Sequence, residues 1–355
     1  MEYNALGSSG LMVSALALGT MTFGVETDET QAVAMLDQFV EQGGTLIDTA
    51  DVYGEGAAEQ IIGRWLRNVP QSCRDGLVLT TKGRFRTGAD ANAEGLSRRH
   101  LTRALETSLR RLDQEHVDLY QLHAWDDLVP LEETLEFARD AVARGLIGYL
   151  GVSNFHGWQV QRASDLADLG HHLRIVSNQV QYNLMSREVE LEIVPACLRS
   201  GIGLLAWSPL AGGWLTGKYR NDETPGTTTR MGQDLPPWLA PMRRAASRGV
   251  EAYQRRAGDS QTWELLRVLQ DVATEVGASQ TAVSLRWLTS RPAVASVIVG
   301  ARHADQLQQS MATTDCALDP THLEALDRAW APTYGDYPYG PIGQNTTRRS
   351  ISTTH

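Results

Sequence analysis

The chain has 355 residues, of which 42% are hydrophobic and 21% are charged. That apolar content excludes an intrinsically disordered protein. The 32 basic and 42 acidic residues leave a formal net charge of −10. Because the basic residues occur singly or in pairs, the chain offers no footprint for a phosphate backbone, and nucleic acid is not an expected partner.

Cysteine usage and hydropathy predict a reducing, aqueous environment. Cys73, Cys197 and Cys316 are scattered and odd in number, which is typical of buried thiols rather than of a disulfide framework or a zinc site. No apolar run approaches the roughly 18 residues that span a bilayer, and the start of the chain lacks the basic and apolar regions of a signal peptide. We therefore expect a cytoplasmic protein that does not contact a membrane.

Short apolar runs alternate with longer amphipathic stretches along the chain. In chain order, the apolar runs predict strands at 15–19, 45–50, 77–82, 117–123, 149–154, 176–181, 203–209 and 296–301. Apolar residues at three- and four-residue spacing predict the intervening helices, the clearest at 30–42, 57–66, 98–112, 131–143, 157–169, 187–200, 261–275 and 280–289.

Eight alternations of strand and helix predict an α/β protein, a closed (β/α)₈ TIM barrel rather than an open doubly wound sheet. The G-x-G-x-x-G turn of an open dinucleotide-binding sheet is absent, as are P-loop, G-x-S-x-G and H-E-x-x-H motifs. We expect one barrel domain over 1–335, with a short N-terminal hairpin, a long loop after the seventh strand, and a C-terminal tail at 336–355.

Two segments interrupt the alternation. Residues 221–258 are too long for a simple connector and contain Trp238 and Met242, so we expect a lid over a bound ligand. The extension from Pro332 is expected to be flexible beyond about Gln344. The alternative is that its aromatic-rich beginning covers one mouth of the barrel.

Polar side chains end most of the predicted strands, at the face where barrels of this kind place their active sites. They are Asp48, Tyr53, Lys82, His123, Ser153, Asn154, Gln179, Trp207 and Ser208. Singly, each has an ordinary structural explanation, such as a turn cap for Asp48 or a satisfied interior histidine for His123. Together, a phenol, an ammonium and a carboxylate form an acid catalyst, because the ammonium favours the phenolate and lowers its pKa.

With these residues in view, the chain resembles the aldo-keto reductases over roughly residues 3–333. The resemblance is carried by GGTLIDTADVYG, TTKG and DLYQLHAWD. It implies that Tyr53 is the general acid, that Lys82 and Asp48 tune it, and that His123 orients the substrate carbonyl.

The resemblance also implies the residues that bind a nicotinamide cofactor. Ser153, Asn154 and Gln179 would hold the carboxamide, and Trp207 would stack under the ring. Further contacts are implied at Gly19, Thr20, Met21 and Asp48 near the first two strand ends, at Ser208, Leu210, Gly213, Leu215 and Lys218 for the pyrophosphate, and at Gly300, Arg302, Gln306, Gln309 and Ser310 for the adenosine phosphate.

Two features of the last segment bear on cofactor choice. Gln309-Ser310 stands where the family usually has Glu-Asn, a departure at the adenine contacts. A guanidinium at Arg302 suits the 2′-phosphate of NADP, which favours NADPH over NADH.

Several aromatic residues bear on the substrate. Trp125 follows His123 by two residues and, with Met21 and Phe23, would line an apolar pocket around Tyr53 and His123. Trp158, Trp263 and Trp287 fall on helical patterns and are interpreted as packing residues.

We therefore interpret the chain as an NADPH-dependent reductase of small aldehydes or ketones that needs no metal; whether it is a monomer or a homo-oligomer stays open. One alternative treats Lys82 as the Schiff-base nucleophile of a barrel aldolase. Another is a redox-sensing subunit that binds cofactor but turns over slowly.

Overall fold

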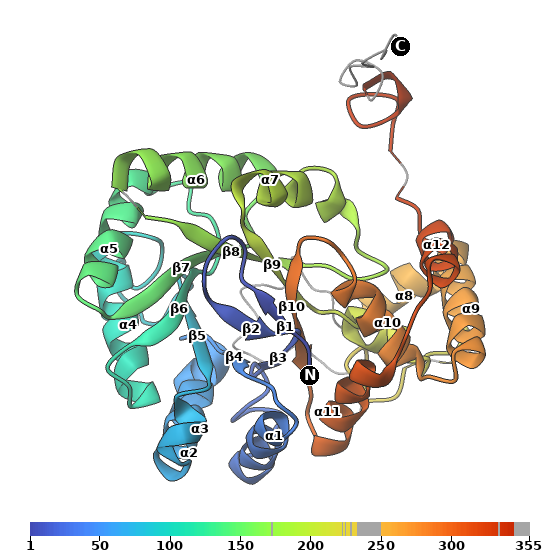
Figure 1. Ribbon diagram of the computed structural model, residues 1–355, viewed down its shortest axis with the longest axis horizontal. Helices are drawn as coiled ribbons and strands as arrows, with labels where there is room; N and C mark the ends of the chain where they lie inside the picture. The colour runs from blue at the N-terminus through green and yellow to red at the C-terminus, as the bar shows by residue number, and fades with distance from the viewer. Residues whose placement is uncertain are drawn as a thin grey trace, which may run out of the picture.

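The computed structural model describes residues 1–171, 173–221, 223, 225–227, 229–232, 250–332 and 334–343. Eight parallel strands close into a barrel in the order β10-β3-β4-β5-β6-β7-β8-β9, with helices around its outside (Figure 1). The barrel strands are β3 (Leu16–Gly19), β4 (Leu46–Asp48), β5 (Val78–Gly83), β6 (Val117–Leu122), β7 (Ile147–Ser153), β8 (Ile175–Gln181), β9 (Gly203–Trp207) and β10 (Val294–Gly300). The predicted (β/α)₈ fold is confirmed.

Helices surround the barrel, and some of them pack on other helices rather than on the strands. They are α1 (Glu29–Glu41), α2 (Ala57–Asn68), α3 (Gln71–Arg74), α4 (Arg98–Leu112), α5 (Leu131–Ala143), α6 (Gly157–His171), α7 (Ile193–Ser200), α8 (Val250–Ala257), α9 (Ser260–Glu275), α10 (Gln280–Thr289), α11 (Ala304–Met311) and α12 (Pro320–Ala329). Short 3₁₀ turns lie at η1 (Tyr53–Gly56), η2 (Glu188–Glu190), η3 (Ala211–Thr216) and η5 (Ala312–Asp315).

Polar side chains cap the first turns of several helices. The side chains of Asp28, Ser97 and Ser279 accept backbone N–H groups at the starts of α1, α4 and α10. Such caps satisfy N–H groups that have no partner inside a helix. They fix the residue at which each of these helices begins.

The predicted helix over 187–200 is wrong in its first half. The structure has the short turn η2 and then α7, which begins only at Ile193. Pro195 accounts for this late start, because proline lacks an N–H and is tolerated only in the first turn of a helix. Helices α3, α8, α11 and α12 were not among the predicted ones.

An antiparallel hairpin of β1 (Tyr3–Ala5) and β2 (Met12–Ser14) lies across the barrel in Figure 1. Leu6 and Val13 join an interior cluster of inward-facing strand residues: Ala17, Leu46, Val78, Leu119, Val176, Leu205, Ala295 and Ile298. The Ser8 N–H donates to the Gly201 carbonyl at 2.7 Å, in the turn before β9. The hairpin therefore closes the end where the strands begin and leaves the polar end to the site.

The two segments that interrupt the alternation are described only in part. Trp238 and Met242, expected in a lid, lie outside the described residues, and α8 occupies the end of that segment. In the extension, the Tyr339 hydroxyl donates to the Glu192 carboxylate, and 344–355 lie outside the described residues. None of the described helices is both long and apolar enough to cross a membrane.

Candidate active site

A buried ammonium group lies at the centre of the polar end of the barrel. Lys82, on β5, is fully buried, and its Nζ lies 2.7 Å from Asp48 Oδ2 and 2.8 Å from the carbonyl oxygen of Thr49. Its third contact is the Tyr53 hydroxyl at 3.3 Å. The structure thus brings together three of the four predicted catalytic side chains in direct contact.

Asp48 ends β4 and is held by amide groups from two other strands. Its Oδ1 accepts the Gln179 side-chain N–H at 2.8 Å, and Gln121 lies 3.5 Å away. The backbone N–H and the hydroxyl of Thr20 both donate to the Asp48 carbonyl at 3.0 Å. These contacts fix the carboxylate while leaving Oδ2 to Lys82.

Burial shapes the pKa values of the Lys82 and Tyr53 pair. Burial alone would lower the Lys82 pKa, but Asp48 and Tyr53 outweigh it and raise that pKa. For Tyr53, burial raises the pKa above its usual value and the Lys82 charge only partly opposes this. The expected lowering of the Tyr53 pKa is therefore wrong for the chain by itself, because the phenol loses more by leaving water than it gains from one ammonium.

His123 follows β6 and completes the group. Its ring lies edge-on to Tyr53, with centroids 5.9 Å apart, and to Phe85 at 4.6 Å. Burial, with the charges of Lys82 and Arg84, holds the pKa of His123 well below its usual value. Nδ1 is buried and has no hydrogen-bond partner among the described residues. A neutral imidazole can donate a hydrogen bond from one ring nitrogen and accept one at the other.

The next two strand ends carry the residues predicted to hold a carboxamide. The Ser153 hydroxyl donates to the Gln179 carbonyl at 3.0 Å, and the Asn154 amide donates to the His123 carbonyl at 3.1 Å. The indole N–H of Trp207, on the neighbouring strand end, donates to Asn154 Oδ1 at 3.1 Å. The half-buried Trp207 ring is thus held at the mouth by the same asparagine.

The loop after β9 places a glycine turn beside cations that fit phosphate. Ala211, Gly212 and Gly213 are left-handed, and a Cβ on Gly213 would come within 2.4 Å of Lys218 Nζ. Partial burial and the charges of Arg302 and Arg230 lower the pKa of Lys218. Cations gathered over a glycine turn are a donor set suited to anions, so these residues fit the phosphates of a dinucleotide. Ser208 and Leu210 are half-buried here, whereas the Leu215 side chain is fully buried in the core.

The segment after β10 is tied to the loop after β3. Thr22 and Thr27 donate their hydroxyls to the carbonyls of Ala301 and Arg302, at 2.9 and 3.3 Å. The Arg302 guanidinium lies 3.7 Å from the Glu26 carboxylate, and its backbone N–H donates to Gln306. Gly300, Gln306 and Gln309 are exposed, but Ser310 is buried and its hydroxyl donates to the Gln306 carbonyl of its own helix.

The predicted substrate residues separate into two groups. Met21 and Trp125 are half-buried, and Trp125 is held by a 2.6 Å hydrogen bond to Asp127. Phe23 is fully buried in the layer between barrel and helices, so the expectation that it lines an open pocket is wrong: its ring turns toward the core. Trp287 packs as predicted, but Trp158 is 57% exposed beside Trp125, with ring centroids 5.2 Å apart.

Two neighbours of the catalytic group were missed by the sequence analysis. Gln121 lies two residues before His123 in an apolar strand, and that position was a usable signal, since alternate strand residues face the same side. Phe85 follows β5 in an irregular loop, where no periodicity shows its direction.

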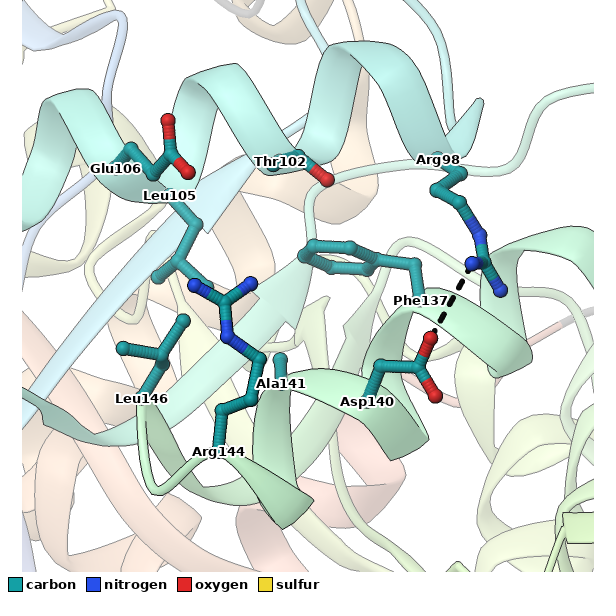
Figure 2. A pocket seen from close by; sticks show the side chains of 9 residues that line it. All are labelled: Arg98, Thr102, Leu105, Glu106, Phe137, Asp140, Ala141, Arg144 and Leu146. Carbon is teal, nitrogen blue, oxygen red and sulfur yellow. Dashed lines mark ion pairs between the residues drawn. The ribbon is translucent and has the colours of Figure 1, made fainter.

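A separate hollow of about 120 Å³ lies outside the barrel, between α4 and α5 (Figure 2). Its lining includes Leu105, Phe137 and Ala141, and the ion pair between Arg98 and Asp140 crosses one end at 3.2 Å. None of its lining residues belongs to the predicted site, so we do not assign it to the substrate.

Comparison with known proteins agrees with this geometry. Residues 15–331 match the Aldo/keto reductase family, and the chain belongs to that family. It is 34% identical to the uncharacterized oxidoreductase YrpG of Bacillus subtilis (strain 168), covering 95% of this chain and 98% of that protein. It is 34% identical to a probable voltage-gated potassium channel subunit beta of Arabidopsis thaliana (92% and 96%) and 29% identical to the versiconal hemiacetal acetate reductase of Aspergillus parasiticus (94% and 98%).

Family membership sets the general chemistry of the protein. It supports an oxidoreductase that acts on small carbonyl compounds and uses a nicotinamide cofactor. The resemblance inferred from the three motifs is thereby confirmed at the level of the family.

The lowered pKa of His123 predicts a pH dependence of folding. Below pH about 6.5 the unfolded chain protonates this histidine, whereas the folded chain keeps it neutral, so stability falls as pH falls. We expect the free energy of unfolding to fall between pH 6.5 and 5.5 more steeply in the wild type than in His123→Gln, by at most about 1.4 kcal/mol per pH unit. Urea unfolding at several pH values across this range measures the free energy of unfolding. If it changed with pH equally steeply in the two proteins, the prediction would be contradicted.

Proposed function

We propose that the protein reduces aldehydes or ketones to alcohols with NADPH, reversibly, and that Tyr53 donates the proton. The observation that carries this proposal is the buried Lys82 ammonium between Asp48 and the Tyr53 hydroxyl. A buried charge needs a compensating partner, and Asp48 alone would satisfy it. The additional contact with a phenol at the barrel mouth is an arrangement suited to acid catalysis.

Each of the four side chains has a separate role in this proposal. The raised pKa of Tyr53 keeps its hydroxyl protonated at neutral pH, as a general acid requires. As the proton moves to the carbonyl oxygen, the Lys82 ammonium stabilises the phenolate that forms, and Asp48 holds that ammonium in place. His123 donates a hydrogen bond from its neutral ring to the same carbonyl oxygen. When bound, NADPH supplies the hydride that reduces the carbonyl carbon.

The proposed preference for NADPH over NADH rests on cations in the segments that follow β9 and β10. Lys218, Arg230 and Arg302 are close enough for the two arginines to lower the Lys218 pKa. Such a cluster is suited to a cofactor that carries one phosphate more than NADH. The carboxamide would bind at Ser153, Asn154 and Gln179, beside the Trp207 ring.

The substrate and its compartment follow from two further observations. Trp125, two residues after His123 in the chain, presents a half-buried ring that packs against Phe155 and Trp158, which favours an apolar carbonyl substrate. All three cysteines are free thiols, which supports a cytoplasmic location.

The aldolase alternative is disfavoured by the state of Lys82. A Schiff-base lysine needs a neutral amine, whereas Asp48 and Tyr53 raise the pKa of Lys82 and keep it charged. The slow redox-sensing subunit is the second candidate, since two relatives are named probable voltage-gated potassium channel subunits beta. Turnover numbers for a panel of carbonyl substrates separate it from an efficient reductase.

Tyr53→Phe tests the proton donor. We expect carbonyl reduction to fall by about 10²- to 10⁴-fold, while NADPH affinity stays within a few-fold, because the hydroxyl acts on substrate. Steady-state NADPH oxidation and fluorescence titration measure the two quantities. The control is Tyr149→Phe, at the opposite end of the barrel interior, which should match the wild type. More than a tenth of wild-type turnover in Tyr53→Phe would show that another group donates the proton.

Arg302→Ala tests the cofactor choice. We expect NADPH binding to weaken by about 1.5–3 kcal/mol, the range for a hydrogen bond to a charged group, and NADH binding to change little. Arg286→Ala, which removes an arginine paired with Glu2 of the N-terminal hairpin, is the control. Isothermal titration calorimetry measures the affinity of each variant for both cofactors. Equal losses of affinity for NADPH and NADH in Arg302→Ala would rule out recognition of the 2′-phosphate by Arg302.

A further inference from the structure

The turn that carries Tyr53 has an unusual backbone. Gly54, Glu55 and Gly56 are all left-handed, with φ values of 57°, 57° and 97°. Glu55 has a side chain, and such residues rarely adopt this region. The surrounding structure must therefore hold the turn in place.

Arg111, on α4, contacts both ends of this turn. Its Nη1 donates to the carbonyl of Asp51 at 2.9 Å, and its Nη2 donates to the carbonyl of Glu55 at 3.3 Å. A Cβ on Gly56 would come within 2.2 Å of the guanidinium carbon, so this close approach requires glycine. One planar group thus holds the backbone on both sides of Tyr53.

Glu59, on α2, connects Arg111 to the strand that carries Lys82. Its side chain is fully buried, and Oε2 lies 3.1 Å from Arg111 Nη1. Its other oxygen accepts the hydroxyl of Thr81 at 2.7 Å, and Thr81 immediately precedes Lys82 on β5. A continuous series of contacts therefore runs from the Lys82 strand to the Tyr53 turn without passing through either catalytic side chain.

A second buried carboxyl group lies against this pair. Asp51 is 2% exposed, and its side-chain oxygens have no hydrogen-bond partner among the described residues. Burial and the neighbouring Glu59 raise the pKa of Asp51 well above its usual value. Glu59, whose carboxylate lies 3.1 Å from Arg111 Nη1, is the acidic group in direct contact with the guanidinium.

We propose that Arg111 and Glu59 are positioning residues for Tyr53, and that they hold its hydroxyl against Lys82 by clamping the left-handed turn. The inference rests on the proposed function, since the position of Tyr53 affects turnover only if Tyr53 is the proton donor. A misplacement of about 1 Å at a reacting group can cost about 100-fold in rate. Arg111 acts on the backbone of the turn, through the carbonyls of Asp51 and Glu55.

Arg111→Lys and Glu59→Gln test the clamp. Lysine keeps the charge but not the planar fork, and glutamine keeps the shape but not the carboxylate. We expect kcat to fall by about 10- to 100-fold, with KM and NADPH affinity within about threefold. In the cofactor-free protein, hydrogen exchange should quicken at the amides of Tyr53 and Glu55, which donate to Ala50 and Val52.

A matched control exists on the same two helices. Arg67 on α2 pairs with Asp113 at the end of α4 at 3.2 Å, and both side chains are more than half exposed. Arg67→Lys should leave kcat and exchange at the turn unchanged, because surface ion pairs contribute little.

Two outcomes would overturn the inference. One is that Arg111→Lys and Glu59→Gln behave like Arg67→Lys in both kcat and exchange. The other is that exchange quickens throughout the barrel and NADPH binding is lost with kcat, which would indicate a general structural role. If Arg111→Lys does not fold, kcat and hydrogen exchange of Glu59→Gln test the inference alone. If Tyr53→Phe stays active while exchange at the turn still quickens in Arg111→Lys, the proposed function fails and the clamp itself stands.

Discussion

The burial of one ammonium group is the constraint on which the site depends. Lys82 is fully buried, so removing its partner would leave an uncompensated charge, at a cost of about 3–5 kcal/mol. Asp48 supplies that partner, and Gln179 and Thr20 fix Asp48 in turn. Asp48 and Lys82 lie on the adjacent strands β4 and β5, whereas Gln179 reaches Asp48 from β8, so the Asp48 carboxylate gains this hydrogen bond only when the barrel is closed. Folding and the assembly of the catalytic group are therefore coupled.

Most of the fold could be predicted from periodicity, because local patterns determine where a strand or helix forms. The strand predicted at 117–123 is one example, since its bounds agree with those of the observed β6 to within one residue. Some helix bounds were nevertheless predicted wrongly, although the signals that fix them are local. The apolar pattern over 187–200 predicts a single helix, yet Pro195 delays its start. Helix α12, which begins with a capping box at Asp319, was not predicted.

The residues of the candidate site could largely be predicted from the sequence, but their pKa values and exposure could not. Strand ends at one face identify Asp48, Lys82 and His123, because parallel strands deliver their final residues to one rim. The direction of the Tyr53 pKa was not accessible, since it depends on how far the phenol is withdrawn from water. Likewise, the sequence does not show that Phe23 is buried and that Trp158 is 57% exposed, because the exposure of each ring depends on tertiary packing. The clamp of Arg111 and Glu59 joins residues 52 positions apart, a separation at which no local pattern is informative.

The most direct test of the account follows the hydrogen that reduces the substrate. NADPH that carries deuterium at the reactive C4 position is incubated with the enzyme and an aldehyde, and the alcohol is analysed by mass spectrometry. Sodium borohydride is added to a parallel sample, and the Lys82 peptide is examined for bound substrate. The account predicts one deuterium on the carbinol carbon of the product and an unmodified Lys82. A product without deuterium, together with substrate trapped on Lys82, would contradict it.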